Sequence, residues 1–265
     1  MVIDFHTHTF PDSVAPRAIA QLSERGGIKP HTEGTLSALK ESMRKNGVDI
    51  SVILPVATSV HQVESINRTA AALNGRDGII YAGAIHPDCE DIEAVLDRIR
   101  SSGLFGIKLH PDYQGVYFDD ERYIKIISEA AKRGLITVTH AGLDVAYPDD
   151  IHCTPRMAQR VIDRLGSLIE DKLVLAHLGG YGMGEEVLSR LAGRKVYMDT
   201  SAVLGASQET NAEIIRRHGA KRILFATDSP WADQGEFLRL IRSYPLSQDE
   251  LELILHQNAE GLLGL

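Results

Sequence analysis

The feature that most constrains the fold of this chain is a regular alternation of short apolar runs with segments of helical periodicity. Each apolar run is rich in Val, Ile and Leu and has the length of a buried strand, and a helix-like stretch follows it. This alternation predicts parallel strands that are joined by helices. The eight predicted strands are Val2–His6, Ile50–Pro55, Ile79–Ile85, Gly106–His110, Thr137–His140, Leu173–His177, Val196–Thr200 and Ile223–Asp228.

Several of the helical segments carry recognisable start and stop signals. The segment Thr35–Asn46 places apolar residues on one side and is followed by Gly47, which is typical of a helix end. Thr154 is a favourable N-cap, and the proline after it suits the first helical position. Two further helices are predicted over Ile92–Ser101 and Glu121–Arg133.

Eight such units in 265 residues predict one α/β domain over residues 1–265, a (β/α)8 TIM barrel. A doubly wound open sheet is the competing fold, but it would normally carry a Gly-rich loop after the first strand. The first strand here ends in His-Thr-His instead. Residues 10–34, which show no clear period, form an insertion after this strand, and residues 141–153 form a long loop after the fifth strand. Both should lie over the carboxyl-terminal mouth of the barrel, where active sites are built.

Composition excludes several classes of function. The net charge is −8 and no run of Lys or Arg is longer than a pair, which argues against a nucleic-acid partner. No apolar stretch approaches the ~20 residues that cross a bilayer. Cys89 and Cys153 are not in a CxxC pair, so we expect two free thiols in a reducing compartment. We therefore expect a cytoplasmic protein that acts on a small molecule.

His6 and His8 stand at the end of the first predicted strand. Side chains two residues apart on a strand face the same way, so both imidazoles can turn toward the barrel axis. Together they could reach one cation at the ~2.0–2.1 Å that is usual for Zn–N bonds. An isolated HxH pair is weak evidence, because two loop histidines explain it equally well.

Four other strands also end in ionisable residues that have the parity of inward-facing side chains. Burying such groups without partners costs several kcal/mol each. A shared metal ion or hydrogen-bond network would remove this cost for all of them together, so the pattern predicts a metal site rather than a structural cluster. The residues are Lys108 and His110, His140, His177, and Asp228.

The order of these residues along the chain resembles that of the amidohydrolase superfamily. The segments VIDFHTHTF, GIKLHP, HAG, AHLGG, ATDSPW and the terminal NAEGLLGL are similar to those of the amidohydrolase-related ("amidohydrolase 2") group, which includes aminocarboxymuconate-semialdehyde decarboxylase. The resemblance extends from Val2 to Leu265. It implies a barrel enzyme with a divalent metal ion.

The resemblance also implies roles for individual residues. His6, His8, His140 and Asp228 would bind the metal, with Zn²⁺ favoured over Mn²⁺ and one ion favoured over two. Asp228 would also deprotonate a water molecule, and His177 would act beside it as a catalytic acid or base. A competing interpretation makes Asp228 the N-cap of the following helix.

Lys108 is open to two interpretations. It could be carbamylated and bridge two metal ions, as in binuclear amidohydrolases, or it could remain a cation near the substrate. Tyr113, Asp144 and His152 are further candidate substrate contacts on the loops. The remaining residues of interest have expected surface or packing roles, or for Asn258 a structural one; they are His31, His61, His218, His256 and Asn258.

The leading functional prediction is a metal-dependent hydrolase of a small carboxylate-, amide- or ester-bearing molecule. The alternative is non-oxidative decarboxylation, or hydration, of an unsaturated or aromatic carboxylic acid. Basic residues aimed at a substrate carboxylate would separate the two, and the insertion offers Arg17, Arg25 and Lys29. A barrel without catalytic activity is a third reading.

Two other enzyme classes of the wider superfamily differ from this chain in what they require at the position of Lys108. TatD-like deoxyribonucleases would carry Glu where Lys108 stands, whereas a phosphotriesterase-like lactonase requires this lysine to be carbamylated. The family resemblance also suggests a homodimer.

Overall fold

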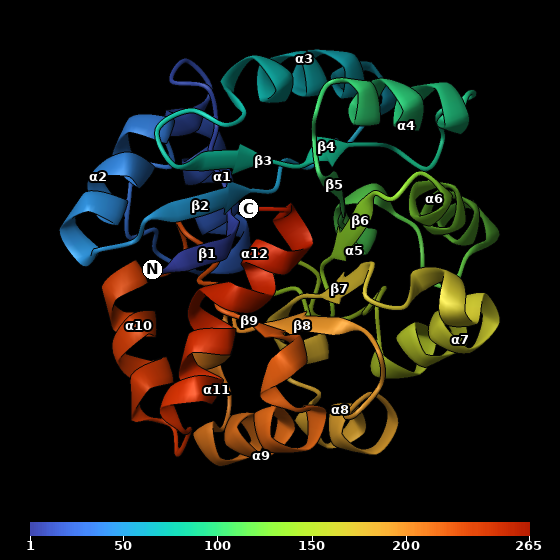
Figure 1. Ribbon diagram of the computed structural model, residues 1–265. Coiled ribbons are helices and arrows are strands. Elements are labelled where there is room, and N and C mark those ends of the chain that lie inside the picture. Colours follow the sequence, from blue (N-terminus) through green and yellow to red (C-terminus); the bar gives the residue numbers. More distant parts are fainter.

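The computed structural model describes residues 1–265 except for the side chain of Leu204. Its strands are all parallel and follow one another in sequence order, in ladders of three (β1–β2–β3) and six (β4–β9) (Figure 1). The backbone N–H of Phe5 donates to the carbonyl of Phe225 at 2.9 Å, which joins the first strand to the last. The predicted (β/α)8 barrel is thereby confirmed, and its third predicted strand, Ile79–Ile85, is divided into two short strands, β3 and β4. The strands are β1 Ile3–Thr7, β2 Ile50–Ile53, β3 Ile79–Tyr81, β4 Gly83–Ala84, β5 Gly106–Leu109, β6 Ile136–Thr139, β7 Leu173–Leu175, β8 Tyr197–Asp199 and β9 Ile223–Leu224.

The helices form the outer layer around the strands (Figure 1). The predicted boundary signals are confirmed, because Thr35 caps α2 and Thr154 caps α7 through their side chains. Gly47 ends α2 with φ 68°, a left-handed conformation that glycine adopts without strain. The helices are α1 Ala15–Gly26, α2 Leu36–Asn46, α3 Val63–Leu73, α4 Ile92–Ser101, α5 Pro111–Gln114, α6 Glu121–Lys132, α7 Pro155–Leu165, α8 Gly184–Arg190, α9 Gln208–His218, α10 Gln234–Ser243, α11 Gln248–Glu252 and α12 Asn258–Leu263.

The insertion after β1 contains a helix that the sequence analysis did not predict. Pro16 lies in the first turn of α1, and Gly27 caps its end with φ 64°, so these residues mark helix boundaries rather than an irregular loop. Ile19 is buried and packs against Gly34, where an added Cβ would lie 2.5 Å from the Ile19 side chain. This packing folds the insertion onto itself.

Two apolar layers stabilise the barrel. One lies between the strands and the surrounding helices, and the other fills the barrel interior. Interior residues come from alternate positions of the strands, as expected where one side of each strand faces the axis. This inner cluster consists of Ile3, Phe5, Val52, Leu54, Ala82, Ile136, Val138, Val174, Leu224, Ala226 and Ala259.

Helix α12 closes the amino-terminal end of the barrel, which faces the viewer in Figure 1. The Asn258 amide donates to the carbonyls of Ala220 and Ile223, both at 2.7 Å, and so ties α12 to the start of β9. This is the structural role that the sequence suggested. His218 is buried against the Val196 carbonyl at 2.8 Å, which confirms its packing role.

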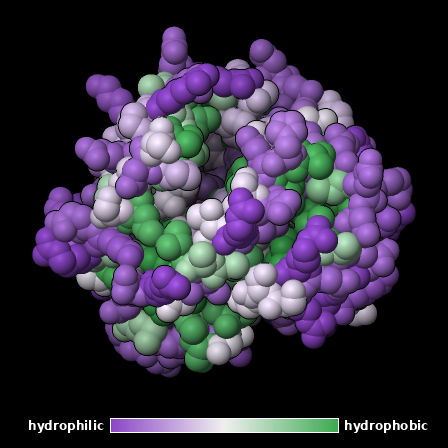
Figure 2. Space-filling model, turned by 90° about the horizontal axis from the view of Figure 1, so that it is seen from above, coloured by the Kyte–Doolittle hydropathy of each residue, from purple (hydrophilic) through white to green (hydrophobic). Residues whose placement is uncertain are grey.

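Hydrophilic residues cover much of the face that Figure 2 shows, and apolar residues gather in patches between them. None of the helices described is long and apolar enough to cross a bilayer. The two cysteines, Cys89 and Cys153, are buried and free, as predicted.

Candidate metal centre

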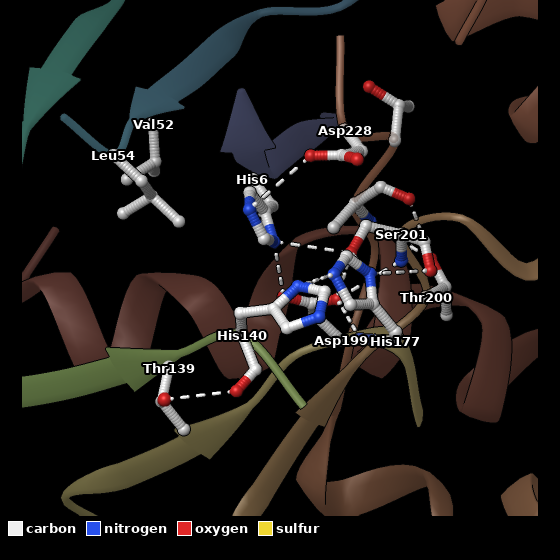
Figure 3. A network of polar contacts seen from close by, with 12 residues as sticks. His6, Val52, Leu54, Thr139, His140, His177, Asp199, Thr200, Ser201 and Asp228 are labelled. Carbon is white, nitrogen blue, oxygen red and sulfur yellow. Dashed lines mark hydrogen bonds and ion pairs between the residues drawn. The ribbon is translucent and has the colours of Figure 1, made fainter. Parts of the chain in front are cut away.

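The predicted site residues meet at the carboxyl ends of the strands. His6 lies near the end of β1 and His8 directly follows it, Lys108 belongs to β5, and Asp228 follows β9. Figure 3 shows His6 directed toward Asp228 on one side and toward the residues that follow β6 and β7 on the other. Parallel strands bring these positions to one end of the barrel because their carboxyl ends share one rim.

An irregularity in β1 decides which way His6 points. The pairing of β1 with β2 shifts register between Asp4 and Thr7. Ile3 and Phe5 belong to the interior cluster, whereas Asp4 accepts a hydrogen bond of 2.8 Å from Gln234 of α10 outside the strands. Strict alternation would turn His6 outward with Asp4, and a bulge of this kind re-aims side chains near active sites. The bulge therefore brings His6 into the site.

His6, His8 and Asp228 form a compact group. The Nε2 atoms of the two histidines lie 3.1 Å apart. An oxygen of the Asp228 carboxylate lies 3.2 Å from His8 Nε2 and 3.5 Å from His6 Nε2. Three such side chains with ligand atoms this close could hold a metal ion. Tetrahedral bonds of ~2.0–2.1 Å would separate two ligand nitrogens by about 3.3 Å. The spacing fits one small divalent cation.

The other ring nitrogens determine the tautomers of this pair. His8 Nδ1 lies 2.9 Å from the Leu54 carbonyl and His6 Nδ1 lies 2.9 Å from the Asp199 carboxylate. Both oxygens only accept, so both Nδ1 atoms carry hydrogen and both Nε2 atoms present lone pairs. Two lone pairs and a carboxylate repel one another unless a cation or donor lies among them. The amine of Lys108 reaches the lone pair of His6 at 2.9 Å, and the lone pair of His8 with the Asp228 carboxylate still suits a metal ion.

Asp228 is placed by its backbone as well as by its neighbours. It has φ 71°, and its N–H donates to the His6 carbonyl at 2.9 Å. Burial raises the pKa of its carboxyl, but the close contacts with His8 and His6 and the nearby His177 outweigh burial and hold the pKa below the ordinary range. Asp233 caps the next helix, so the N-cap interpretation of Asp228 is wrong.

Lys108 completes this side of the site. Its Nζ lies 2.9 Å from His6 Nε2, and its side chain is completely buried. Burial lowers the pKa of Lys108 to about 8, against the opposing influence of Asp199 and Asp228. Burial and Lys108 together lower the pKa of His6 to about 3, so this imidazole stays neutral near pH 7.

His140 and His177 form a hydrogen bond with each other rather than with the pair on β1. His140 Nδ1 lies 3.0 Å from His177 Nε2, while His140 Nε2 is buried without a partner in the protein. The ring of His177 lies over that of His6 with centroids 5.4 Å apart. A cavity of about 430 Å³ borders His177. His140 thus lies one side chain away from the compact group, and its place as a fourth metal ligand stays a prediction.

Asp199 and Ser201 also lie in this candidate site, and the sequence analysis missed them. Asp199 ends β8 as a fully buried carboxylate, and Ser201 Oγ lies 2.8 Å from His177 Nδ1. Burial raises the pKa of Asp199, but His6 and His177 lower it further, so the carboxyl stays ionised. The available signal was the position of Asp199 as the last residue of its strand.

The loop residues predicted to contact substrate divide into two groups. Asp144 lies 3.4 Å from His110 Nε2, and the Tyr113 ring stands edge-on to His110 at 4.3 Å. Burial raises the pKa of Asp144 to about 6. His152 instead uses both ring nitrogens on Pro111 and Asp150, outside this group. The structure brings Tyr113 and Asp144 to the mouth and leaves His152 beside it.

Arg25 is the basic residue of the insertion that reaches the long loop. Its guanidinium carbon lies 4.0 Å from the centre of the Tyr147 ring, which in turn packs against Tyr113 at 5.4 Å. Arg25 also acts on the pKa values of Tyr113 and Asp144, which places its charge near the mouth. Arg25, Arg17 and Lys29 are all exposed on the insertion, and Arg25 is distinguished by its contact with Tyr147.

A parallel barrel with ionisable side chains gathered at the carboxyl ends of its strands has the arrangement of barrel enzymes. The chain belongs to the amidohydrolase family, whose pattern it matches over residues 3–265. No curated protein sequence matches the chain.

Solved structures share the fold at low sequence identity. A 2,6-dihydroxybenzoate decarboxylase in complex with 2,6-dihydroxybenzoate is 16% identical, with a TM-score of 0.72 over 100% of this chain and 99% of that one. The 5-carboxyvanillate decarboxylase from Sphingomonas paucimobilis is 17% identical, with a TM-score of 0.67 over 100% of this chain and 99% of that one. A dihydroxybenzoic acid decarboxylase from a Polaromonas species was solved with bound manganese and the inhibitor 2-nitroresorcinol. It is 14% identical, with a TM-score of 0.71 over 100% of this chain and 97% of that one.

Proposed function

We propose that this protein is a divalent-metal-dependent enzyme that acts on a small carboxylate-, amide- or ester-bearing molecule. The observation that carries the proposal is the convergence of two imidazole lone pairs and a carboxylate from His6, His8 and Asp228 at the mouth of an amidohydrolase barrel. These residues would hold one ion, Zn²⁺ or Mn²⁺, with His140 as the fourth candidate ligand. The ion would supply Lewis acidity, which polarises a carbonyl and lowers the pKa of water.

Residues of the chain supply the proton transfers. Asp228 is ionised, so it can accept a proton from water within hydrogen-bond reach. Burial lowers the pKa of His177, so its imidazole is neutral and can accept a proton. Its hydrogen bond with His140 would let that proton be shared between the two rings. In hydrolysis, water adds to an ester, lactone or amide carbonyl, the C–O or C–N bond breaks, and the leaving group receives the proton that Asp228 took up. Hydrolysis is the first candidate reaction because Asp228 lies next to the paired imidazoles.

Decarboxylation is the second candidate, and the activities named for three similar structures favour it. In this reaction the C–C bond to the carboxylate breaks, CO₂ leaves, and the electron pair on carbon takes up a proton, which His177 or Asp228 would deliver. A substrate carboxylate needs a cation to face it. Arg25, held above Tyr147 at the mouth, is the residue proposed for that contact.

The two reactions can be separated in one experiment. The metal-loaded protein is incubated in H₂¹⁸O with a panel of small lactones, amides and aromatic acids, and ¹⁸O incorporation and released CO₂ are measured together. Turnover with ¹⁸O in the product supports hydrolysis, and CO₂ release without ¹⁸O in the organic product supports decarboxylation. Failure of the protein to bind Zn²⁺ or Mn²⁺ would overturn the proposed function.

The carboxylate contact has its own test. Arg25→Gln should raise KM for acidic substrates about tenfold, because a charge-assisted hydrogen bond is worth roughly 1.5–3 kcal/mol. Arg17→Gln is the matched control, since it removes the same charge from an exposed position on the same insertion. Equal effects of the two substitutions would contradict a specific role for Arg25.

A further inference from the structure

The carboxylate of Asp199 contacts two different histidines of the site, and it lies outside the predicted metal set. One oxygen accepts a hydrogen bond of 2.9 Å from His6 Nδ1. The other accepts from the backbone N–H of His177 at 3.0 Å, from the N–H of Ser201 at 3.1 Å and from the Ser201 hydroxyl. Figure 3 shows these residues linked in one network.

The first oxygen controls the tautomer of His6. Because an ionised carboxylate only accepts, it retains the hydrogen on Nδ1 and leaves the lone pair on Nε2. That Nε2 atom faces His8 Nε2 at 3.1 Å and is the atom through which His6 would bind a metal. Carboxylates that hold ligand histidines in this way raise metal affinity, and their loss typically costs 10–100-fold.

The second oxygen controls His177 in two ways. Its contact with the backbone holds a residue that has φ 59°, an uncommon conformation for a residue with a side chain. Its hydrogen bond from the Ser201 hydroxyl leaves that hydroxyl oxygen free to accept from His177 Nδ1 at 2.8 Å, beside the Ser201 carbonyl at 3.2 Å. The His177 lone pair is thereby turned to Nε2, the atom that faces His140.

We propose that Asp199 is a positioning residue that sets, with one side chain, the tautomer of the metal-binding His6 and the orientation of the proton-transferring His177. The roles of these two histidines rest on the proposed function above, but the tautomer control does not. The two contacts can be separated by substitution. Asp199 is the nearer partner of His6 Nδ1, at 2.9 Å against 3.1 Å for the Ser201 hydroxyl, whereas His177 Nδ1 depends on Ser201 for both of its partners.

The test compares Asp199→Asn with Ser201→Ala. Isothermal titration with Zn²⁺ alone should show a ten- to hundred-fold loss of affinity for Asp199→Asn. Ser201→Ala should keep Zn²⁺ affinity within about threefold, while kcat on any substrate found in the panel above falls. Equal losses of Zn²⁺ affinity in the two variants, or none in Asp199→Asn, would overturn the proposal.

A spectroscopic measurement keeps the inference testable if Asp199→Asn fails to fold. Nitrogen-15 shifts of the histidine rings in the metal-free wild type should show His6 protonated at Nδ1, with the signal assigned by its loss in His6→Gln. Protonation of His6 at Nε2 would overturn the proposal. If the wild type binds no Zn²⁺ or Mn²⁺ but shows the expected tautomer, the proposed function fails and the positioning role stands.

Discussion

The two sides of the barrel mouth are built in contrasting ways. On the β1 side, both ring nitrogens of His6 and the Nδ1 of His8 have partners in the protein. On the β5–β6 side, three of the four buried side-chain atoms without such a partner, among the residues described, come together: His110 Nδ1, Asp112 Oδ2 and His140 Nε2. The Asp112 oxygen lies 3.9 Å from each of the two nitrogens, beyond hydrogen-bond reach.

This difference assigns the two sides different tasks. A metal site requires fixed ligand geometry, which the β1 side obtains from Asp199 and the Leu54 carbonyl. Buried acceptors without a partner each cost roughly 1–3 kcal/mol, and a donor from water or substrate would recover that cost. We therefore expect the β1 side, together with His140 as the fourth candidate ligand, to govern metal binding. We expect the rest of the β5–β6 side to govern substrate binding.

The largest effect is expected from Asp228→Ala. It removes a ligand and the proposed base together, so activity should fall at least about 10³-fold and bound metal should drop well below one ion per chain. Elemental analysis of protein purified without chelator measures the metal. The control is Asp233→Ala, which removes the cap of α10 nearby and should cost only about 1 kcal/mol of stability with metal retained. Full metal content in Asp228→Ala would contradict the proposal that Asp228 is a metal ligand.

Lys108→Met should have the next largest effect. The substitution removes a buried amine 2.9 Å from His6 Nε2, so turnover should fall about 10²-fold through lost electrostatic stabilisation. Metal content should stay near one ion per chain in both proteins if the lysine is uncarbamylated. Two ions in the wild type and fewer in the variant would instead show that a carbamylated Lys108 bridges two metal ions.

Asp112→Asn tests the proposed task of the β5–β6 side. The change keeps the oxygen that accepts from the His152 N–H at 3.2 Å and replaces the unpartnered oxygen with an amide. We expect KM to rise about tenfold, which corresponds to ~1.4 kcal/mol, and metal content to stay unchanged. A loss of metal in this variant would show that the two sides do not have separate tasks.

The smallest effect concerns pH and a histidine far from the site. Burial lowers the pKa of His218 from 6.5, so the folded state binds fewer protons than the unfolded state below that pH. Stability should therefore fall as pH drops below about 6.5, and His218→Gln should abolish up to about 1.4 kcal/mol of that loss at pH 5.5. Urea titrations of metal-free wild type and variant at pH 7.5 and 5.5 measure the difference. An equal loss in both proteins would show that His218 does not contribute.

The fold could be read from the sequence because its signals are local. Strand length, helical spacing and caps such as Thr35 act within a few residues, and the structure keeps them. The helix α1 was missed because its apolar stripe is short, and only Ala15 and Ile19 are buried. The only local sign of Asp199 is its position at a strand end, and this sign is weak because a strand-terminal aspartate has many uses in a barrel.

The sequence by itself determined the alternating strands and helices, and it placed His6, His8, Lys108, His177 and Asp228 at the strand ends. The tertiary structure alone decided which of these side chains meet. A bulge turned His6 inward, and barrel closure brought it to Asp199, 193 residues away, and kept His140 against His177. The physical reason is that periodicity sets the face of a side chain, whereas its partners depend on register, bulges and loops that form only when the barrel closes.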